Sequence, residues 1–474
     1  ATAGFFGRLN YNYKEKYLLE VNGRYDGTSR FMKDQRWNFF PSFSLGWNVA
    51  RENFWKPLES VVNQFKLRGS WGELGNQNTS NLYPFYEILP VKSNSGNWLV
   101  NGGKTNTADI PSLVSTLLTW ERVRSFNVGF DFGAFSNRLT GSFDYFVRKT
   151  VDMVGPAPQL PLVLGIAPAI VNNADMKSYG FEIELSWRDR IGEVDYGVKF
   201  NLADAQQKVV KYPNTTNAFS DWYAGKMSGE IWGYTSLGIA KTDEEMKEHL
   251  ASLPNGGQNQ LGNKWGAGDI MYADINGDGK VDGGKGTLAD PGDQRIIGNS
   301  TPRYNFGLVL DTSYKGFDVS IFFQGVGKRD YAPIVGTNGA VFWGAVNNIW
   351  QSMAMEEHFD YFRPEGHPMG ANLNGYYPRP DFTSNKNHQV QTRYLQDASY
   401  IRLKNLQIGY TLPKQWINKL HINRCRVYVS GDNLWTGTSL ASMFDPETLA
   451  AGDWGSGKTY PLSKVISFGL NVNF

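Results

Sequence analysis

The stretch Ile466-Ser-Phe-Gly-Leu-Asn-Val-Asn-Phe474 shows the pattern that decides the fold of this 474-residue chain. Every second residue is apolar, and the residues between them are Ser, Gly and Asn. Successive side chains of a β-strand point to opposite faces of a sheet. The stretch therefore predicts a strand with one apolar and one polar face.

The same alternation recurs from end to end. It predicts thirteen strands, near residues 4–13, 17–27, 38–50, 64–75, 120–132, 138–150, 177–189, 193–206, 303–313, 316–328, 399–411, 424–436 and 462–474. The apolar set changes phase between Leu403 and Leu406. One extra residue in the strand explains such a slip, so we expect a β-bulge near Lys404-Asn405.

The predicted connections alternate in length through most of the chain. The short ones lie at 14–16, 134–137, 190–192 and 315–316. The longest span 76–119, 207–302 and 329–398, and together they hold close to half of the chain. Outer-membrane β-barrels have this layout, with short periplasmic turns and long extracellular loops. A soluble sandwich or propeller has no reason to collect its long loops at one end.

The two faces of the strands also suit a bilayer. Lipid offers no hydrogen-bond partners, so a sheet in the membrane must close, with its apolar face toward lipid and its polar face toward the lumen. Aromatic residues near predicted strand ends fit the interfacial girdles of such barrels; they are Tyr11, Tyr13, Tyr17, Trp187 and Tyr410. The terminal Phe474 resembles the signal read by the outer-membrane insertion machinery. We therefore predict an all-β, transmembrane antiparallel β-barrel in the outer membrane.

Composition excludes several other classes. The formal net charge is only +2, which does not point to nucleic acid, and the single Cys cannot form a disulfide within the chain. The longest mostly apolar run, near 161–171, is too short for a transmembrane helix and contains Pro161 and Pro168. Aromatic residues make up 14% of the chain, which argues against disorder.

The start Ala1-Thr2-Ala3-Gly4-Phe5 has no initiator Met and no signal-like run. It suits the later part of a longer protein, or a mature protein cleaved after an A-x-A site. Bacterial single-chain barrels have even strand numbers. The odd count of thirteen favours the first interpretation, with earlier strands upstream of Ala1.

Several motifs, in this order, carry a family resemblance. They are Gly7-Arg-Leu-Asn-Tyr11, Arg24-Tyr-Asp-Gly-Thr-Ser-Arg-Phe31, Phe40-Pro-Ser-Phe-Ser-Leu-Gly-Trp47, Leu67-Arg-Gly-Ser-Trp-Gly72, Asp274-Ile-Asn-Gly-Asp-Gly279, Ile297-Gly-Asn299, Tyr400-Ile-Arg-Leu-Lys-Asn405 and Gly431-Asp-Asn-Leu434. With them the chain resembles the C-terminal part of SusC/RagA-type TonB-dependent transporters of Bacteroidota.

That resemblance implies a 22-stranded plugged barrel, of which residues 1–474 are the C-terminal part. The plug domain, the TonB box and the first barrel strands would then lie outside this sequence. It further implies active import of an oligosaccharide or oligopeptide, energised by TonB-ExbB-ExbD through the plug, under a SusD-like lipoprotein lid. A dimer of transporter–lipoprotein pairs is an arrangement that the resemblance allows.

The most specific local motif is an acidic loop whose candidate metal ligands are Asp274, Asn276, Asp278, Lys280 (through its carbonyl) and Asp282. It matches the first nine positions of an EF-hand loop, whose alternate oxygens surround one hard cation. Position twelve is Lys285 in place of Glu, so Asp290 or Asp293 would have to complete a structural Ca²⁺ site. The alternative is a turn rich in Asp, Asn and Gly that binds nothing.

No catalytic pattern emerges. The sequence has no G-x-S-x-G or P-loop, and its five His residues lack metal-ligand spacing. We therefore do not expect an enzyme.

Aromatic residues in the long connections either contact ligand or lid, or pack the loops together; they are Trp222, Tyr223, Trp232, Tyr234, Trp265, Trp343, Trp350, Tyr361, Tyr376 and Tyr377. Residues 241–252 predict a loop helix with Thr242 and Glu245 as a capping box.

Two other functions remain as alternatives to import. A passive diffusion porin needs no plug domain or TonB box. A secreted all-β glycan-binding protein would stay in solution without detergent.

Overall fold

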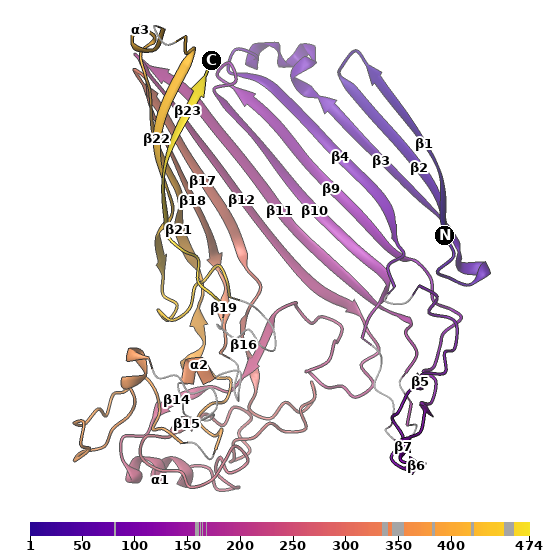
Figure 1. The fold of residues 1–474 in the computed structure, drawn as a ribbon, viewed down its shortest axis with the longest axis vertical. Helices are drawn as coiled ribbons and strands as arrows, with labels where there is room; N and C mark the ends of the chain where they lie inside the picture. The colour runs from indigo at the N-terminus through magenta and orange to yellow at the C-terminus, as the bar shows by residue number, and fades with distance from the viewer. Residues whose placement is uncertain are drawn as a thin grey trace. The chain divides into compact units, whose positions relative to one another are not determined.

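A computed structural model describes residues 1–79, 82–156, 161, 163, 165–166, 168–333, 340–343, 355–381, 384–418, 421–449 and 459–474. In that part of the chain, thirteen long strands form one sheet in chain order (Figure 1). They are β1 (Thr2–Tyr13), β2 (Tyr17–Thr28), β3 (Trp37–Asn48), β4 (Val62–Asn76), β9 (Glu121–Ala134), β10 (Leu139–Val154), β11 (Asn172–Ile191), β12 (Val194–Lys211), β17 (Arg303–Tyr314), β18 (Phe317–Lys328), β21 (Tyr400–Thr411), β22 (Arg424–Thr438) and β23 (Val465–Asn473). The thirteen predicted strands are confirmed, each to within five residues at either end.

The chain divides into two compact units. The first comprises Ala1–Ile183 and Ala205–Met227, and the second Glu184–Asp204 and Ser228–Phe474. In the first unit, β1, β2, β3, β4, β9 and β10 pair antiparallel, each with the next. In the second, β12, β17, β18, β21, β22 and β23 do the same. Each unit is therefore an up-and-down meander, as the short turns require.

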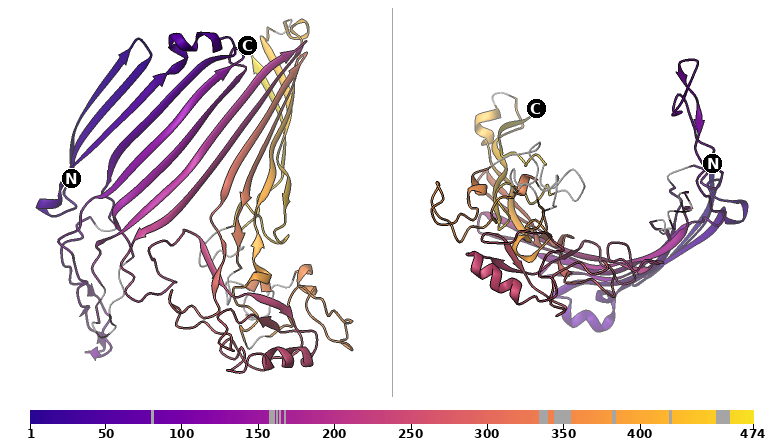
Figure 2. Two further views of the ribbon diagram at one scale, coloured as in Figure 1. Left: turned by 180° about the vertical axis from the view of Figure 1, so that it is seen from behind. Right: turned by 90° about the horizontal axis from the view of Figure 1, so that it is seen from below.

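Short and long connections lie at opposite ends of the strands, as predicted. In each unit, Figure 2 shows tight turns at one end and extended loops at the other. The turn from β1 to β2 closes through a hydrogen bond from Lys16 N to Tyr13 O of 3.0 Å. The rings of Tyr13 and Tyr17 stack beside this turn at 6.4 Å, where an interfacial girdle was expected.

The predicted bulge in β21 is confirmed. Its register shifts between Leu403 and Asn405 against both β18 and β22, so that Lys404 has no paired residue. Because of this extra residue, the apolar side chains in the second half of β21 point to the same face of the sheet as those in the first half.

The connections carry short elements of their own. Small two-stranded sheets pair β5 (Val91–Lys92) with β8 (Thr107–Ala108), β6 (Leu99–Val100) with β7 (Gly103–Lys104), β13 (Glu230–Gly233) with β16 (Arg295–Asn299), β14 (Ser236–Ile239) with β15 (Ile270–Tyr272), and β19 (Asp330–Tyr331) with β20 (Gln396–Asp397). The α-helices are α1 (Asp243–Ala251), α2 (Ala340–Trp343) and α3 (Lys414–Ile417). Short 3-10 helices lie at Lys33–Gln35, Val49–Arg51, Asn53–Leu58, Glu356–Phe359 and Thr392–Tyr394.

The helix predicted near 241–252 forms as α1, but its cap differs from the prediction. Thr242 accepts from Glu245 N at 3.1 Å, as a capping box requires. Glu245 accepts from Lys241 N at 2.6 Å and not from the backbone of Thr242. Among the described residues, no helix is both long and apolar enough to cross a membrane.

The largest apolar core lies in the long connections of the second unit. We call their described residues, 228–302, 329–333, 340–343, 355–381, 384–399 and 439–449, the loop body. Its buried cluster contains Tyr234, Leu253, Ile270, Tyr272, Val281, Tyr331, Phe342, Trp343, Tyr377, Tyr394, Ala398, Leu440, Phe444 and Leu449. These connections are therefore a folded module with their own core.

Candidate functional site: the polar strand face and the loop body

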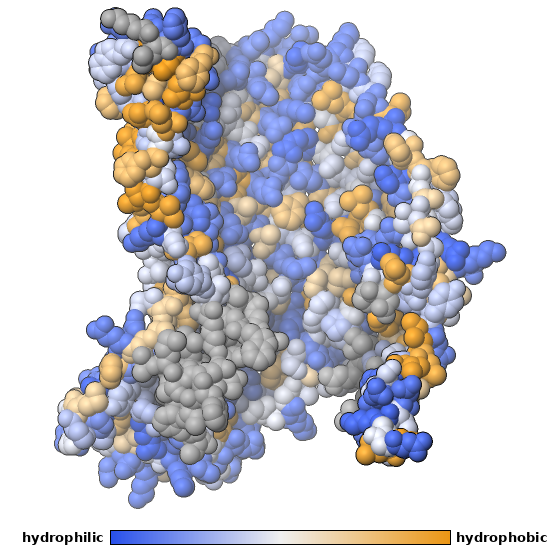
Figure 3. Space-filling view, in the orientation of Figure 1, coloured by the Kyte–Doolittle hydropathy of each residue, from blue (hydrophilic) through white to orange (hydrophobic). Residues whose placement is uncertain are grey.

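The two faces of the strands in the first unit differ in chemistry. On one face, large apolar side chains are roughly half exposed, including Leu45 at 58% and Phe126 at 47%. Rings on this face meet across strands, as in the pair Phe43–Trp71 at 5.4 Å. The face seen in Figure 3 is mostly hydrophilic. This division is what a wall between lipid and a wet lumen requires.

Ion pairs between strands cross the polar face, and some of them reach over an intervening strand. Arg68 of β4 binds Asp144 of β10 at 2.5 Å and Asp131 of β9 at 3.0 Å. In the second unit, Arg426 of β22 donates its Nε to Asp318 of β18 at 2.9 Å. An Arg between carboxylates on adjacent strands holds its partners through several donors at once, so the wall is charged and also fixed in position.

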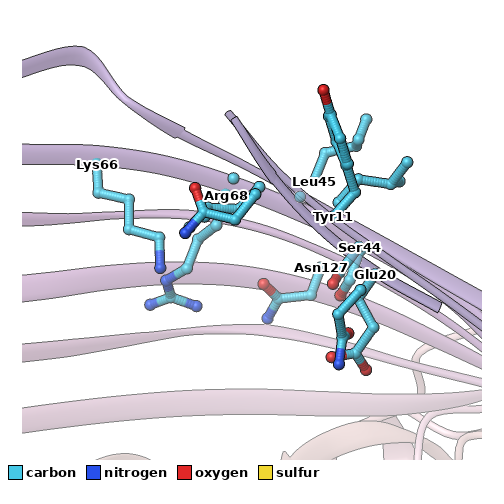
Figure 4. Close-up of a pocket in the computed structure, with 14 residues that line it drawn as sticks. Tyr11, Glu20, Ser44, Leu45, Lys66, Arg68 and Asn127 are labelled. Atoms are coloured by element: carbon cyan, nitrogen blue, oxygen red, sulfur yellow. The ribbon is translucent and has the colours of Figure 1, made fainter. Parts of the chain in front are cut away.

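A shallow cavity of about 470 Å³ opens on the polar face of the first unit. Figure 4 shows Glu20, Arg68 and Asn127 on the polar side, with Tyr11 and Leu45 directed to the other side of the sheet. Amide, carboxylate and guanidinium groups can all exchange hydrogen bonds with a polar solute or with another polar protein surface.

A second polar cavity, of about 670 Å³, lies at the short-turn end of the second unit. Arg188, Asp189, Asp195, Asp311 and Asp318 are among its lining residues. Both cavities are open depressions in a strand wall, lined by charged and polar side chains together with apolar ones.

A buried charge network organises the loop body. Asp269 is fully buried and accepts from Lys386 Nζ at 2.8 Å and from Arg379 Nη2 at 2.8 Å. Asn387 Nδ2 and Gly266 N complete its shell at 2.9 Å each. Lys386 is also buried, so its charge has little access to water. Residues more than a hundred positions apart are thus joined at one carboxylate.

The guanidinium of Arg329 joins three long connections. It donates to the carbonyl of Ser300 at 3.2 Å, to that of Pro446 at 3.3 Å and to that of Leu449 at 3.1 Å. All three partners are backbone oxygens. The connections after β12, β18 and β22 are therefore held together at one point.

A second ion network ties the connection after β22 to the wall. Arg402 of β21 binds Asp445 at 2.7 Å and Glu447 at 2.7 Å, and its side chain is only 4% exposed. Lys404, the unpaired residue of the bulge, also binds Glu447 at 2.7 Å. The bulge thus places a second cation beside Glu447.

The aromatic residues predicted in the loops have two different environments. Tyr234, Trp343 and Tyr377 are buried in the loop-body core, so for these three the packing interpretation is confirmed. Trp265, Tyr361 and Tyr376 are partly exposed and also pack against that core. Trp222, Tyr223 and Trp232 are partly exposed as well. For all six, contact with ligand or lid stays a prediction. Trp350 lies outside the described residues.

The acidic loop at 274–282 is curled by hydrogen bonds between its own side chains and the following backbone amides. Asp274 accepts from Gly279 N at 2.8 Å, Asn276 from Asp278 N at 3.0 Å, and Asp278 from Lys280 N at 3.1 Å. Such bonds from alternate side chains to the following amides curl the chain around a centre. The predicted ligands are thus brought close together in one curl.

Two further features of this loop affect whether it can bind a metal ion. Asp293 is fully buried and accepts from Ile275 N at 2.7 Å and from Asp282 N at 2.8 Å, and burial raises the pKa of its carboxyl. The Lys280 ammonium lies 2.5 Å from Asp282, and this bond lowers the pKa of Asp282. In the described ranges, no group of three or more His, Cys, Asp or Glu is arranged to hold an ion.

Lys285 and Asp290 were the other two positions considered for this loop, and they pair with each other outside the curl. Lys285 N donates to the carbonyl of Asp290 at 3.1 Å in a separate turn. Of the two carboxylates considered as a completing ligand, Asp293 is therefore the one that contacts the curl.

Three features of this region were not predicted from the sequence: the Asp269 network, the Arg329 contacts and the Arg402 network. Apart from the contact of Gly266 with Asp269, the contacts of these features join residues that are 29 to 120 positions apart along the chain. No local spacing rule can connect residues so far apart. The bulge at Lys404 was the one visible signal, and it marks the place where the second network reaches the wall.

Comparisons with known proteins place this geometry in a family. A family model described as "TonB dependent receptor-like, beta-barrel" matches residues 1–434. TonB-dependent receptor P3 of Formosa agariphila is 30% identical, over 99% of this chain and 45% of that protein. TonB-dependent receptor SusC of Bacteroides thetaiotaomicron is 24% identical, over 99% of this chain and 43% of that protein. The chain spans about half the length of these curated relatives.

Solved structures share the fold. The structure described as the RagAB peptide transporter matches with a TM-score of 0.75 at 22% identity, covering 100% of this chain and 47% of that chain. At this identity the match establishes the architecture and not the ligand.

Proposed function

Because the chain belongs to the TonB-dependent receptor family of outer-membrane β-barrels, with SusC/RagA-type relatives, we propose that it forms the wall and loop module of a nutrient importer. In this proposal, the polar face lines the path of an oligosaccharide or oligopeptide. A plug coupled to TonB-ExbB-ExbD, in a part of the protein that precedes this chain, opens that path. The observation that carries the proposal is the thirteen-stranded wall with one polar face, matched by the family model over residues 1–434.

A SusD-like lipoprotein over the long loops is the second part of the proposal. The loop body supports it, because a partner that opens and closes needs a surface that keeps its own structure. The buried core around Tyr272 and the Asp269 network would hold the surface of the loop body in one structure. Purifying the full-length protein by a tag and identifying a stoichiometric surface lipoprotein would test this part. A transporter recovered alone from gently solubilised membranes would contradict it.

Uptake by whole cells tests import and separates it from a passive porin. Cells carrying the full-length gene should accumulate labelled oligosaccharides or oligopeptides, and a protonophore should abolish accumulation, because TonB uses the proton-motive force. Uptake that survives the protonophore would indicate a porin. Recovery of the full-length protein in the soluble fraction without detergent would indicate a secreted glycan-binding protein.

We further propose that the 274–282 loop binds one structural Ca²⁺ when the ion is present. Asp274, Asn276, Asp278 and Asp282 supply oxygen donors of the kind that Ca²⁺ prefers, and the Lys280 carbonyl completes the alternation. Lys280 would have to move its ammonium away from Asp282. The buried carboxylate of Asp293 favours a nearby cation, since an uncompensated buried charge is costly.

Calcium titration of the full-length protein after chelation tests this site. Asp274→Asn with Asp278→Asn should remove one bound ion, whereas Asp109→Asn in another loop should not. Equal calcium content in all three proteins would contradict the proposal.

A further inference from the structure

The apolar face of the first unit ends at a sharp charged boundary. Trp71, Phe126 and Val147 lie opposite one another on β4, β9 and β10, and form one apolar row. The next row on the same face, two residues further along each strand, consists of Glu73, Arg124 and Lys149. A membrane protein changes from apolar to charged where hydrocarbon gives way to headgroups.

This boundary lies at the end of the strands that carries the long loops. β4 runs toward the connection 77–120, and β9 starts from it. In an outer-membrane barrel the long loops are extracellular. The charged row therefore lies at the level of the outer-leaflet headgroups.

The carboxylate in this row holds two guanidinium groups, one in the same row and one in the next row toward the long loops. Arg122 Nε binds Glu73 Oε1, and Arg124 Nε binds Glu73 Oε2 at 3.1 Å. The Glu73 side chain is 7% exposed, whereas those of Arg122 and Arg124 are 31% and 43% exposed. Gly75 of β4 lies opposite Arg122. The Glu73 carboxylate is therefore buried beneath the two guanidinium groups that it orients.

The cluster has more positive charge than the described residues neutralise. Within the described part of the chain, Glu73 is the one carboxylate that binds Arg122 and Arg124, and it occupies only their Nε atoms. Lys149, opposite Arg124, has no acidic partner in that part of the chain. The Nη groups and the ammonium remain available to an external anion.

We propose that Arg122, Arg124 and Lys149, oriented by Glu73, bind the phosphate-bearing headgroup of an outer-leaflet lipid. Guanidinium groups with free Nη atoms match phosphate oxygens through paired hydrogen bonds. Cations at a membrane surface are stabilised by anionic headgroups and are costly beside hydrocarbon alone. The inference rests on the outer-membrane placement of the barrel and not on its substrate.

Lipid binding by the full-length transporter tests the proposal. The protein is placed in nanodiscs of phosphatidylcholine with increasing lipid A, and bound lipid A is counted by native mass spectrometry. Arg122→Gln with Arg124→Gln should weaken lipid A binding by about 30-fold, because each cation near a headgroup contributes about 1 kcal/mol. Lys149→Gln alone should weaken it by about 5-fold on the same basis.

The control removes two cations from short turns at the opposite end of the strands. Arg190→Gln with Lys315→Gln should leave lipid A binding unchanged, since both residues are exposed in those turns. Heat-modifiable migration confirms that each variant has folded, and Arg122→Lys with Arg124→Lys keeps the charge if the glutamine pair does not fold.

Two results would overturn the proposal: equal loss of lipid A in the control and the cluster variants, or no loss in either. Complete competition by millimolar inorganic phosphate would assign the cluster to a free anion instead, and would overturn it as well.

Discussion

Asp269 illustrates how much one side chain controls in the loop body. Its carboxylate neutralises Lys386, which is 1% exposed, and also binds Arg379 and Asn387. Asp269→Asn removes the closer partner of the buried ammonium and leaves it with Asp381, at 3.9 Å, as its counter-charge. Removing one partner of a buried pair costs about 3–5 kcal/mol, and the more distant Asp381 offsets part of that cost. We expect hydrogen exchange in the loop body to become much faster while the strands remain protected.

Asp109 provides the matched control for Asp269. It pairs with Lys92 at 2.5 Å, but both side chains are about half exposed. Exposed pairs contribute about 0–1 kcal/mol, so Asp109→Asn should leave exchange in the loop body unchanged. If both variants behave alike, the network around Asp269 does not hold the loop body together.

His388 should make the loop body sensitive to acid. Its ring stacks on Trp343 at 4.4 Å, and burial lowers its pKa from the ordinary 6.5 to about 4. Between these two pH values the unfolded loop body binds a proton that the folded one does not. Stability is therefore complete above pH 6.5 and falls by on the order of 3 kcal/mol as the pH drops to about 4.

Hydrogen exchange of the loop body at pH 7.5 and at pH 5, corrected for intrinsic rates, measures this loss. In His388→Gln the difference between the two pH values should shrink, whereas His421→Gln, in a short connection outside the loop body, should retain it. An unchanged difference in His388→Gln would assign the sensitivity to other groups.

At the scale of single elements, the tight turns offer a matched pair of glycines. Gly316 and Gly192 both have positive φ, +89° and +60°. A Cβ on Gly316 would lie 2.8 Å from the Thr411 carbonyl oxygen, whereas one on Gly192 would meet nothing within 4 Å. Gly192→Ala should cost about 1 kcal/mol from its backbone conformation alone, and Gly316→Ala should cost more. Urea unfolding of the full-length barrel gives both values, and an equal cost would show that the contact relaxes freely.

Most elements of the wall could be predicted because their pattern is local. Alternation along a strand reports the chemistry of its two faces, and all thirteen long strands showed it, including the phase slip at Lys404. The connections are harder, because their helices and small sheets depend on contacts between distant segments. The 3-10 helices at Val49–Arg51 and Asn53–Leu58 were not predicted either.

The candidate site was predicted in part. The acidic loop at 274–282 is a local motif, and its curl is present. The exposed row of Arg124 and Lys149 depends on strand register, which alternation alone does not determine. The sequence around Asp269 does not distinguish it from other acidic residues in loops. Its partners Arg379, Lys386 and Asn387 follow more than a hundred residues later.

For the whole molecule, the two outermost strands have the largest consequence. In the described part of the sheet, β1 pairs only with β2, and β23 only with β22. Each therefore leaves one side of its backbone without ladder partners, which lipid cannot replace. Residues 1–474 produced alone should aggregate or remain sensitive to protease, whereas the full-length protein should migrate as a heat-modifiable barrel. Efficient membrane insertion of the isolated segment would contradict this expectation.

The contacts of Arg329 have a consequence for how such proteins diversify. The guanidinium recognises only main-chain carbonyls at Ser300, Pro446 and Leu449, and carbonyls are the same whatever residue carries them. Substitutions at these positions can therefore accumulate without breaking the junction, provided that the backbone path is kept. One arginine thus allows the sequence of the surrounding loops to change by mutation while the point that joins them is kept.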